Sequence, residues 1–350
     1  MKRLVSAKLS WRTGTAIVIA NMIGAGVFTS LGFQLEDISN TWTILFAWFL
    51  GGVIALAGAF AYAEVGTSIN ESGGEYTFLS KIFHPVVGYL SGWISLSVGF
   101  AAPVALAAIA FSKYSGIVIF DYYVTSIVII LLISLIHCIN STTSAYFQNV
   151  STLLKVGLII LIIICGIYIP PNISEQGFAN YTSNSSILSI PYAIALIYVS
   201  YSYTGWNASA YIIQEFKNVK RDVPRSLILG TIVVIILYVL LQYVFLKHAS
   251  ISELKGNVEV GAIAIKNMLG PTYGKLINSG IALFLVSSIS AMIWVGPRVS
   301  NKMGQDHKLW SFLYSGDKIP VNAIFFQASL SILLILTGTF EQILIYCGIL

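Results

Sequence analysis

The feature that most constrains this chain is a succession of apolar runs, each long enough to cross a lipid bilayer. A spanning helix needs about 20 mainly apolar residues, and runs of this length follow one another along the whole chain. Charged residues make up only 9% of it, against roughly 25% in soluble domains, so water could not solvate such a fold. We expect spans at approximately 12–34, 41–69, 85–111, 122–139, 146–169, 187–214, 225–247, 272–299 and 320–338, and the start of a tenth near residue 341.

The continuity of these runs favours helices over strands. Transmembrane strands read as short segments of alternating hydrophobicity, and no such alternation is present. The sequence therefore predicts an all-α integral membrane protein that crosses the bilayer several times.

The basic residues predict the orientation. With the N-terminus in the cytoplasm, 13 of the 19 Lys and Arg residues fall on the cytoplasmic side, 5 fall outside, and Lys155 lies within a span. This distribution obeys the positive-inside rule, which the inverted topology would violate. We expect a multi-pass protein of the plasma membrane with a cytoplasmic N-terminus.

The cysteines give no indication of a metal or a cofactor. Cys138, Cys165 and Cys347 lie within apolar stretches, without the paired spacing of metal ligands. We expect buried thiols, no metal site and no cofactor.

Two spans contain segments that should interrupt a helix. The first span carries Gly24 and Gly26 near its middle, and the sixth carries the stretch from Ser202 to Asn207, which includes Gly205. Glycine costs about 1 kcal/mol relative to alanine in a helix interior, and lipid offers no replacement hydrogen bonds. We expect both helices to unwind at these points.

The five-span separation of the two breaks predicts an inverted repeat. Spans 1–5, at about 12–169, and the segment 187–350 would form two repeats within a single transport domain, the second of them incomplete. An odd number of spans per repeat turns the second repeat over in the membrane. Matching breaks in such repeats point to a substrate site at the membrane midplane.

The exposed backbone at such breaks suits a zwitterion. Freed N–H groups at the start of the second half of span 1 suit a carboxylate, and freed carbonyls before each break suit an ammonium group. A site that offers both fits an α-amino acid.

At these residues the chain resembles the amino acid–polyamine–organocation superfamily, whose members have the inverted-repeat leucine-transporter fold. The Trp-Asn pair after the second break and the lysine of span 5 are most similar to the L-type, sodium-independent branch. Four stretches carry the resemblance in family order: Ile23-Gly24-Ala25-Gly26-Val27-Phe28; Ala61-Tyr62-Ala63-Glu64-Val65-Gly66 leading to Glu71-Ser72-Gly73-Gly74-Glu75-Tyr76; Tyr203-Thr204-Gly205-Trp206-Asn207 followed by Glu215-Phe216-Lys217-Asn218; and Gly296-Pro297-Arg298-Val299.

The resemblance implies which residues bind substrate. Backbone N–H groups of residues 24–26 would bind the carboxylate, and carbonyls of Met22, Tyr201 and Thr204 would meet the ammonium. Tyr201 would also close over the substrate from outside, while Asn207 would contact the substrate or a gate. Family members often have serine where this chain has Ala25, which lacks that hydroxyl. The expected substrate-binding residues are Met22, Ile23, Gly24, Ala25, Gly26, Tyr201, Ser202, Thr204, Gly205 and Asn207.

Lys155 is the expected coupling residue. Its ammonium would lie against the break in span 1, in place of the sodium ion that sodium-coupled relatives hold there, and would take part in proton coupling. Interface anchoring by a long side chain is the alternative. Ser287 and Ser288 are expected to hydrogen-bond locally, so sodium is not expected as a partner, whereas protons are.

The expected function is secondary active transport of amino acids by alternating access, as an antiporter that exchanges substrates or as a proton symporter. Neutral substrates are favoured because no carboxylate is expected beside either break; polyamines or cationic amino acids are the alternative. Family members usually have twelve spans, which suggests C-terminal truncation and, as a further alternative, an inactive or regulatory remnant. No set of catalytic groups indicates an enzyme, and nothing indicates a nucleic-acid partner.

Overall fold

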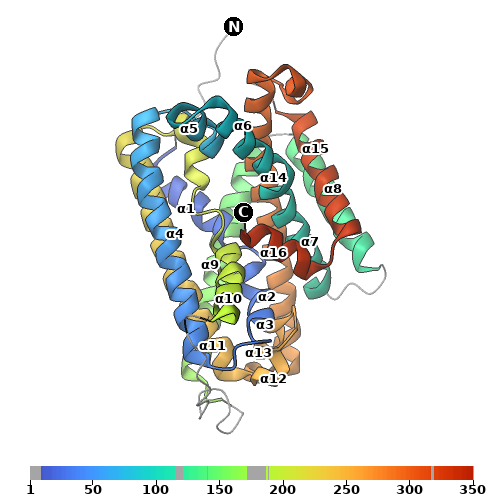
Figure 1. The fold of residues 1–350 in the computed structure, drawn as a ribbon. Coiled ribbons are helices and arrows are strands. Elements are labelled where there is room, and N and C mark those ends of the chain that lie inside the picture. The colour runs from blue at the N-terminus through green and yellow to red at the C-terminus, as the bar shows by residue number, and fades with distance from the viewer. Residues whose placement is uncertain are drawn as a thin grey trace.

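The computed structural model describes residues 9–115, 121–139, 141–171, 187, 189–316 and 319–349, and most of these residues are helical. Figure 1 shows the helices arranged as one bundle. Within the described residues, β structure consists of one isolated bridge between Leu9 and Phe216. The helices are α1 (Trp11–Met22), α2 (Gly26–Thr29), α3 (Leu31–Gln34), α4 (Thr41–Ile69), α5 (Gly74–Ile82), α6 (Pro85–Ile94), the π-helix η1 (Ser95–Gly99), α7 (Ala101–Ser115), α8 (Tyr122–Ile139), α9 (Ser141–Tyr168), α10 (Ile190–Tyr203), the 3₁₀ helix η2 (Ala208–Glu215), α11 (Val219–His248), α12 (Ile251–Leu254), α13 (Val260–Leu269), α14 (Pro271–Asp306), the 3₁₀ helix η3 (Lys308–Leu313), α15 (Val321–Thr337) and α16 (Phe340–Ile349).

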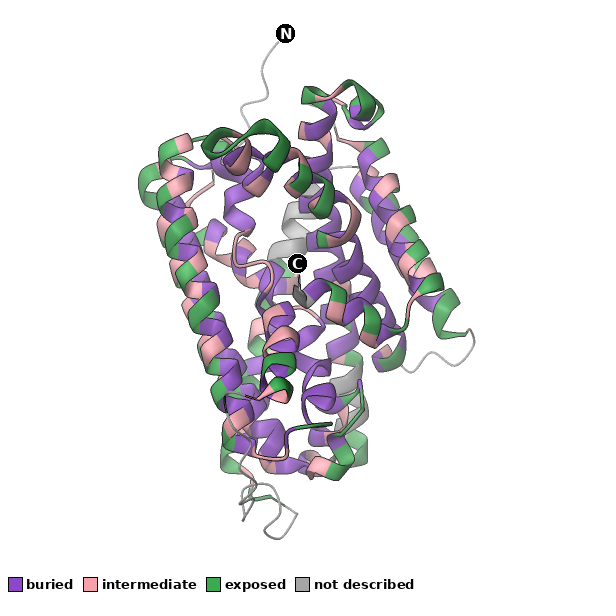
Figure 2. Cartoon of the chain, in the orientation of Figure 1, coloured by how far each residue is buried: buried purple, intermediate pink, exposed green. Residues whose placement is uncertain are grey.

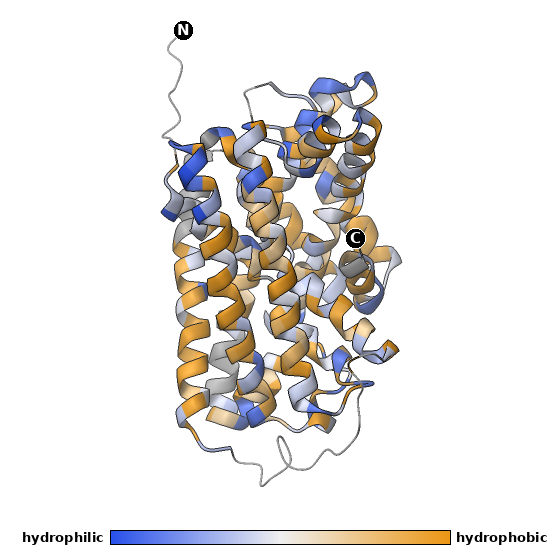
Figure 3. Ribbon diagram, turned by 60° about the vertical axis from the view of Figure 1, so that its left-hand side comes forward, coloured by the Kyte–Doolittle hydropathy of each residue, from blue (hydrophilic) through white to orange (hydrophobic). Residues whose placement is uncertain are grey.

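Six helices of the described chain are long and apolar enough to cross a membrane. They are Thr41–Ile69, Pro85–Ser115, Tyr122–Ile139, Val150–Tyr168, Val219–His248 and Ser279–Asp306. Figure 3 shows hydrophobic residues along the middle of the bundle and hydrophilic residues gathered towards its two ends. The prediction of an all-helical, multi-pass membrane protein is therefore confirmed.

The helices pack in pairs around a buried centre. α4 lies along α11 on one side of the bundle and α8 lies beside α15 on the other, while α14 packs against α7 between them (Figure 1). α7 is rich in alanine, and Ala102, Ala105 and Ala108 are fully buried. Small side chains let helix backbones approach closely where lipid supplies no hydrophobic driving force. Figure 2 shows the exposed residues of α4 and α8 on the outside of the bundle.

The structure divides three of the predicted spans. Span 12–34 becomes α1, α2 and α3, and span 187–214 becomes α10 and η2, as the glycine positions predict. Span 85–111 is also interrupted, because the π-helix Ser95–Gly99 separates α6 from α7. This third irregularity was not predicted from the sequence. Such π segments are frequent at functional sites.

One contact joins the beginning of α1 to the end of η2. Leu9 and Phe216 form a parallel bridge, and the N–H of Lys217 donates to the carbonyl of Leu9 over 3.0 Å. The Phe216 ring packs so closely on Gly14 that a Cβ there would lie 2.6 Å from it. The segments that flank the two breaks on this side of the bundle are therefore attached to each other.

Candidate functional site

The first break is a three-residue interruption in the helix. α1 ends at Met22 and α2 begins at Gly26, and Gly24 N donates to Met22 O over 2.8 Å. Among the described residues, no acceptor bonds to the backbone N–H groups of Ala25, Gly26 or Val27. These are unsatisfied donors of the kind that an anionic group needs.

Carbonyl groups around the first break are bonded instead by side chains of a distant helix. The Tyr238 hydroxyl donates to Met22 O over 2.6 Å, and Gln242 Nε2 donates to Val27 O over 2.7 Å. Both side chains come from α11 and are fully buried. Since an unpaired buried carbonyl is costly, these bonds replace the helical bonds that the break removes.

Lys155 bonds to the same break from α9. Its Nζ lies 2.7 Å from Ile23 O and 2.9 Å from Ser288 Oγ, and Ser288 Oγ in turn donates to Ile23 O over 3.0 Å. Lys155 is 1% exposed. The structure describes no ion pair to this ammonium, whose partners are neutral oxygens. The ammonium of Lys155 is thus buried against the first break.

The second break is stabilised by its own residues. α10 ends at Tyr203, Gly205 has a φ of 97°, and η2 begins at Ala208. The N–H and the hydroxyl of Thr204 both donate to Tyr201 O, over 3.1 and 2.7 Å. A positive φ of this size is readily adopted only by glycine, so Gly205 makes this turn possible.

The two breaks pack against each other through their glycines. A Cβ on Gly26 would lie 2.8 Å from Ser202 Cα in α10, and a Cβ on Gly205 would lie 2.8 Å from the backbone carbon of Asn21 in α1. Gly24 has more room, since the nearest atom to its Cβ would be 3.9 Å away. Each interrupted helix therefore leaves space for the other.

The carbonyls expected to bind an ammonium differ in availability. Met22 O already accepts from Tyr238 and from Gly24 N, and Tyr201 O accepts both donors of Thr204. Thr204 O accepts no hydrogen bond from the described residues. In this conformation, Thr204 O is therefore the carbonyl of the three that is most available to an ammonium group.

Seven of the ten expected substrate-binding residues line one small cavity between the breaks. Its volume is about 20 Å³, room for about one water molecule, so an amino acid requires it to widen. Gly205 and Asn207 line a larger neighbouring cavity. Ile23 lines neither, and its carbonyl bonds to Lys155. The seven are Met22, Gly24, Ala25, Gly26, Tyr201, Ser202 and Thr204.

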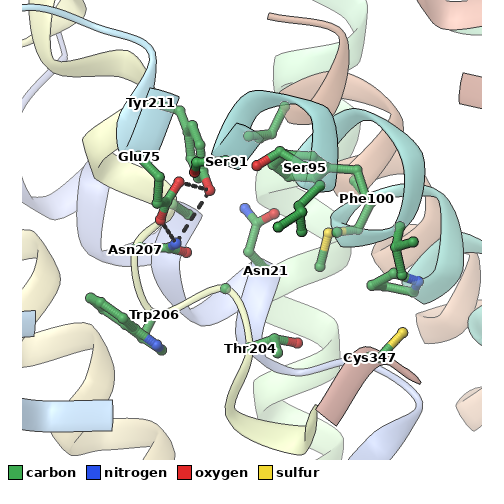
Figure 4. A pocket seen from close by; sticks show the side chains of 18 of the residues that line it. Asn21, Glu75, Ser91, Ser95, Phe100, Thr204, Trp206, Asn207, Tyr211 and Cys347 are labelled. Atoms are coloured by element: carbon green, nitrogen blue, oxygen red, sulfur yellow. Dashed lines mark hydrogen bonds between the residues drawn. The ribbon is translucent and has the colours of Figure 1, made fainter. Parts of the chain in front are cut away.

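The larger cavity has a volume of about 660 Å³, within the range of small-molecule sites. Its lining residues run from the breaks to α5 and the start of α6 (Figure 4). These two helices lie at the end of the bundle where α1 begins (Figure 1). Asn21, Thr204 and Met292 line both cavities. A solute entering from this end would therefore reach the breaks.

A carboxylate lies beside the second break, contrary to expectation. Glu75 accepts hydrogen bonds from Asn207 Nδ2 and, over 2.5 Å, from the Tyr211 hydroxyl (Figure 4). The expectation was wrong because Glu75 is far from the breaks in sequence and reaches them from α5, a helix the apolar pattern does not reveal. Asn207 accordingly contacts Glu75.

Sequence reasoning missed several residues that line the larger cavity. Asn21 is a buried amide directly before the first break, and Ser91 and Ser95 come from α6 and the π-helix (Figure 4). The polar Asn21 within an apolar run was a usable signal. No sequence signal marked Ser91 and Ser95, because they face the cavity only through the packing of α6.

Comparison with known proteins identifies the family of the chain. The serine/threonine exchanger SteT of Bacillus subtilis (strain 168) is 28% identical over 341 residues, which cover 93% of this chain and 76% of the relative. The human cystine/glutamate transporter is 26% identical, covering 96% and 69%. Large neutral amino acids transporter small subunit 2 of Mus musculus is 24% identical, covering 95% and 65%. The amino acid permease family model matches residues 9–345, and the chain therefore belongs to that family.

Proposed function

We propose that this chain binds an α-amino acid at the two helix breaks and carries it across the membrane by alternating access. The observation that carries the proposal is the reciprocal packing of the breaks around a cavity, with free N–H groups at residues 25–27 on one side and the free Thr204 carbonyl on the other. Together they offer partners to a carboxylate and to an ammonium group.

The two breaks also support the inverted-repeat arrangement. Gly26 abuts α10 and Gly205 abuts α1, which is the reciprocity that two repeats related by a pseudo-two-fold axis would have. We propose one transport domain with repeats at about 12–169 and 187–350. The N-terminus is proposed to be cytoplasmic and the membrane the plasma membrane; Lys2, Arg3 and Lys8, which contribute to that orientation, lie outside the described residues.

Lys155 is proposed to replace a sodium ion at the first break. Its ammonium meets two oxygens, Ile23 O and Ser288 Oγ, at 2.7 and 2.9 Å. A cation held covalently at this position makes sodium unnecessary, and exchange of its proton during the cycle would couple transport to protons.

We propose neutral amino acids as the substrate class and exchange as the mode of transport. Relatives named for serine/threonine exchange and for large neutral amino acids favour this reading. Cationic amino acids are the second candidate, and the observation that favours them is Glu75 in the larger cavity.

Counter-transport in liposomes tests the proposal. The purified chain is reconstituted into vesicles loaded with unlabelled L-serine, and uptake of labelled L-serine is measured with and without a sodium or a pH gradient. Uptake that requires internal amino acid is expected of an exchanger. No uptake above that of empty vesicles under any gradient would contradict the proposal.

A further inference from the structure

We propose that Glu75 sets the charge selectivity of the permeation path, favouring zwitterionic and cationic amino acids over acidic ones. This inference rests on the proposed transport function and names a residue that discriminates among its substrates. It concerns the larger cavity, which lies between the breaks and one end of the bundle.

Glu75 is the sole formally charged side chain among the described residues that line this cavity. The wall opposite is largely apolar and includes Val87, Leu90 and Ile94 of α6. Low-dielectric walls focus the field of a charge into the aqueous space between them. One negative charge therefore dominates the potential that a substrate side chain meets.

Glu75 accepts two hydrogen bonds. The donors are Asn207 Nδ2 and the Tyr211 hydroxyl. Both partners are neutral, so they orient the carboxylate and leave its charge uncompensated.

The position of Glu75 makes its charge unavoidable for a solute. Its partner Asn207 lies two residues after Gly205, which places the carboxylate beside the second break. The same cavity shares the lining residues Asn21 and Thr204 with the small cavity. An amino acid that reaches the breaks from this end passes the carboxylate.

A second glutamate close in sequence provides a matched comparison. Glu71 pairs with Lys81 over 2.5 Å, and the two side chains are 42% and 46% exposed. Glu71 does not line the larger cavity; with Lys81 it lines a separate recess near Lys302. Its charge is compensated and screened by solvent, so it should not influence selectivity.

Competition binding to the purified chain tests the inference. Displacement of labelled L-serine by L-lysine and by L-glutamate is measured for the wild type, Glu75→Gln, Glu75→Asp and Glu71→Gln. One unit charge about 10 Å away at an effective dielectric constant of about 20 changes affinity on the order of tenfold. We expect Glu75→Gln to weaken lysine binding and to strengthen glutamate binding by about tenfold each, which shifts the lysine-to-glutamate affinity ratio by about 100-fold towards glutamate. Glu75→Asp and Glu71→Gln should keep the wild-type ratio.

An independent variant covers the case in which Glu75→Gln does not fold. Ser91→Lys adds a positive charge to the α6 side of the same cavity and should shift the ratio in the same direction. An unchanged ratio in a folded Glu75→Gln, or in Ser91→Lys if the former does not fold, overturns the inference while serine binding by the wild type leaves the proposed function standing. Absence of any amino acid binding by the wild type overturns both.

Discussion

The two helix breaks are stabilised in different ways. Around the first, carbonyls accept hydrogen bonds from α9, α11 and α14, through Lys155, Tyr238 and Ser288. Around the second, the Thr204 side chain bonds within its own segment, and Asn207 and Glu75 link η2 to α5. The first break is thus fixed to the body of the bundle, whereas the second depends on local bonds and on a short helix at one end.

This difference suggests which break moves. Opening the first break would expose several buried polar groups at once, and each such group costs about 1–3 kcal/mol when left unsatisfied. The second break can change its backbone with fewer losses. We therefore expect the small cavity to widen through movement at Thr204 and Gly205, with the first break as the fixed side of the site.

The largest expected effect comes from closing the contact between the breaks. Gly26→Val would place a side chain where Ser202 Cα lies 2.8 Å from the Cβ position. Forcing the breaks apart by about 1 Å should lower uptake by about 100-fold, as misplacements of this size do at functional sites. The loss is measured as uptake of a labelled amino acid into vesicles that contain the variant. Gly24→Ala, with its nearest neighbour 3.9 Å away, should fold normally and lose less uptake than Gly26→Val. Equal damage from both would refute the crowding argument.

Removing the lysine at the first break should have the next largest effect. Lys155→Ala deletes charge-assisted bonds to Ile23 O and Ser288 Oγ, each worth about 1.5–3 kcal/mol, so uptake should fall at least about tenfold. The control is Lys247→Ala, since Lys247 also donates to backbone carbonyls, of Gly166 and Ile167, but near the end of α9. That variant should lose stability and keep its substrate affinity. Normal uptake by Lys155→Ala would exclude a role in coupling.

An intermediate effect is expected at the turn of the second break. Gly205→Ala must hold a φ of 97° with its Cβ 2.8 Å from the Asn21 backbone. Strain of this kind costs about 1–3 kcal/mol, and we expect a lower melting temperature with uptake reduced several-fold. Gly157→Ala in α9 is the control, because nothing lies within 4 Å of its Cβ position, and it should melt at or above the wild-type temperature. Uptake and melting temperature equal to the wild type in Gly205→Ala would show that the turn is not strained.

The smallest expected effects come from removing one hydroxyl group at each break. Tyr238→Phe removes the bond that joins α11 to Met22 O, and Thr204→Val removes a bond within one turn. Each should cost on the order of 1 kcal/mol, with Tyr238→Phe the more destabilising because its partner carbonyl is buried between helices. Thermal unfolding of the two variants measures the difference. A larger loss from Thr204→Val would reverse the proposed ranking of the breaks.

Much of the fold was predictable because apolar runs of membrane length have few alternatives. The boundaries of α4 and α8 match the predicted spans at both ends. The positions of both interruptions followed from glycines that a lipid-embedded helix does not tolerate without reason. Short amphipathic elements such as α5 and α13 were missed, since neither is long enough to be recognised as a span.

The candidate site was less predictable, because its polar groups come from separate helices. Lys155 was recognisable as a lone charge within a span, and the structure places its ammonium against Ile23 O. Glu75 was not recognisable from the sequence, because it lies outside every predicted span and contacts Asn207 only through the packing of α5. The hydrogen bond from Tyr238 to Met22 O depends on a tertiary contact that spacing cannot reveal, whereas the bond from Thr204 to Tyr201 O is local.

The bridge between Leu9 and Phe216 has a mechanical consequence. It couples α1 to η2 outside the two cavities, and the Phe216 ring packs on Gly14 of the same helix. When Thr204 and Gly205 change conformation, the far end of η2 is therefore held at the start of α1. A larger displacement of η2 would first have to detach the Leu9 carbonyl from the Lys217 N–H.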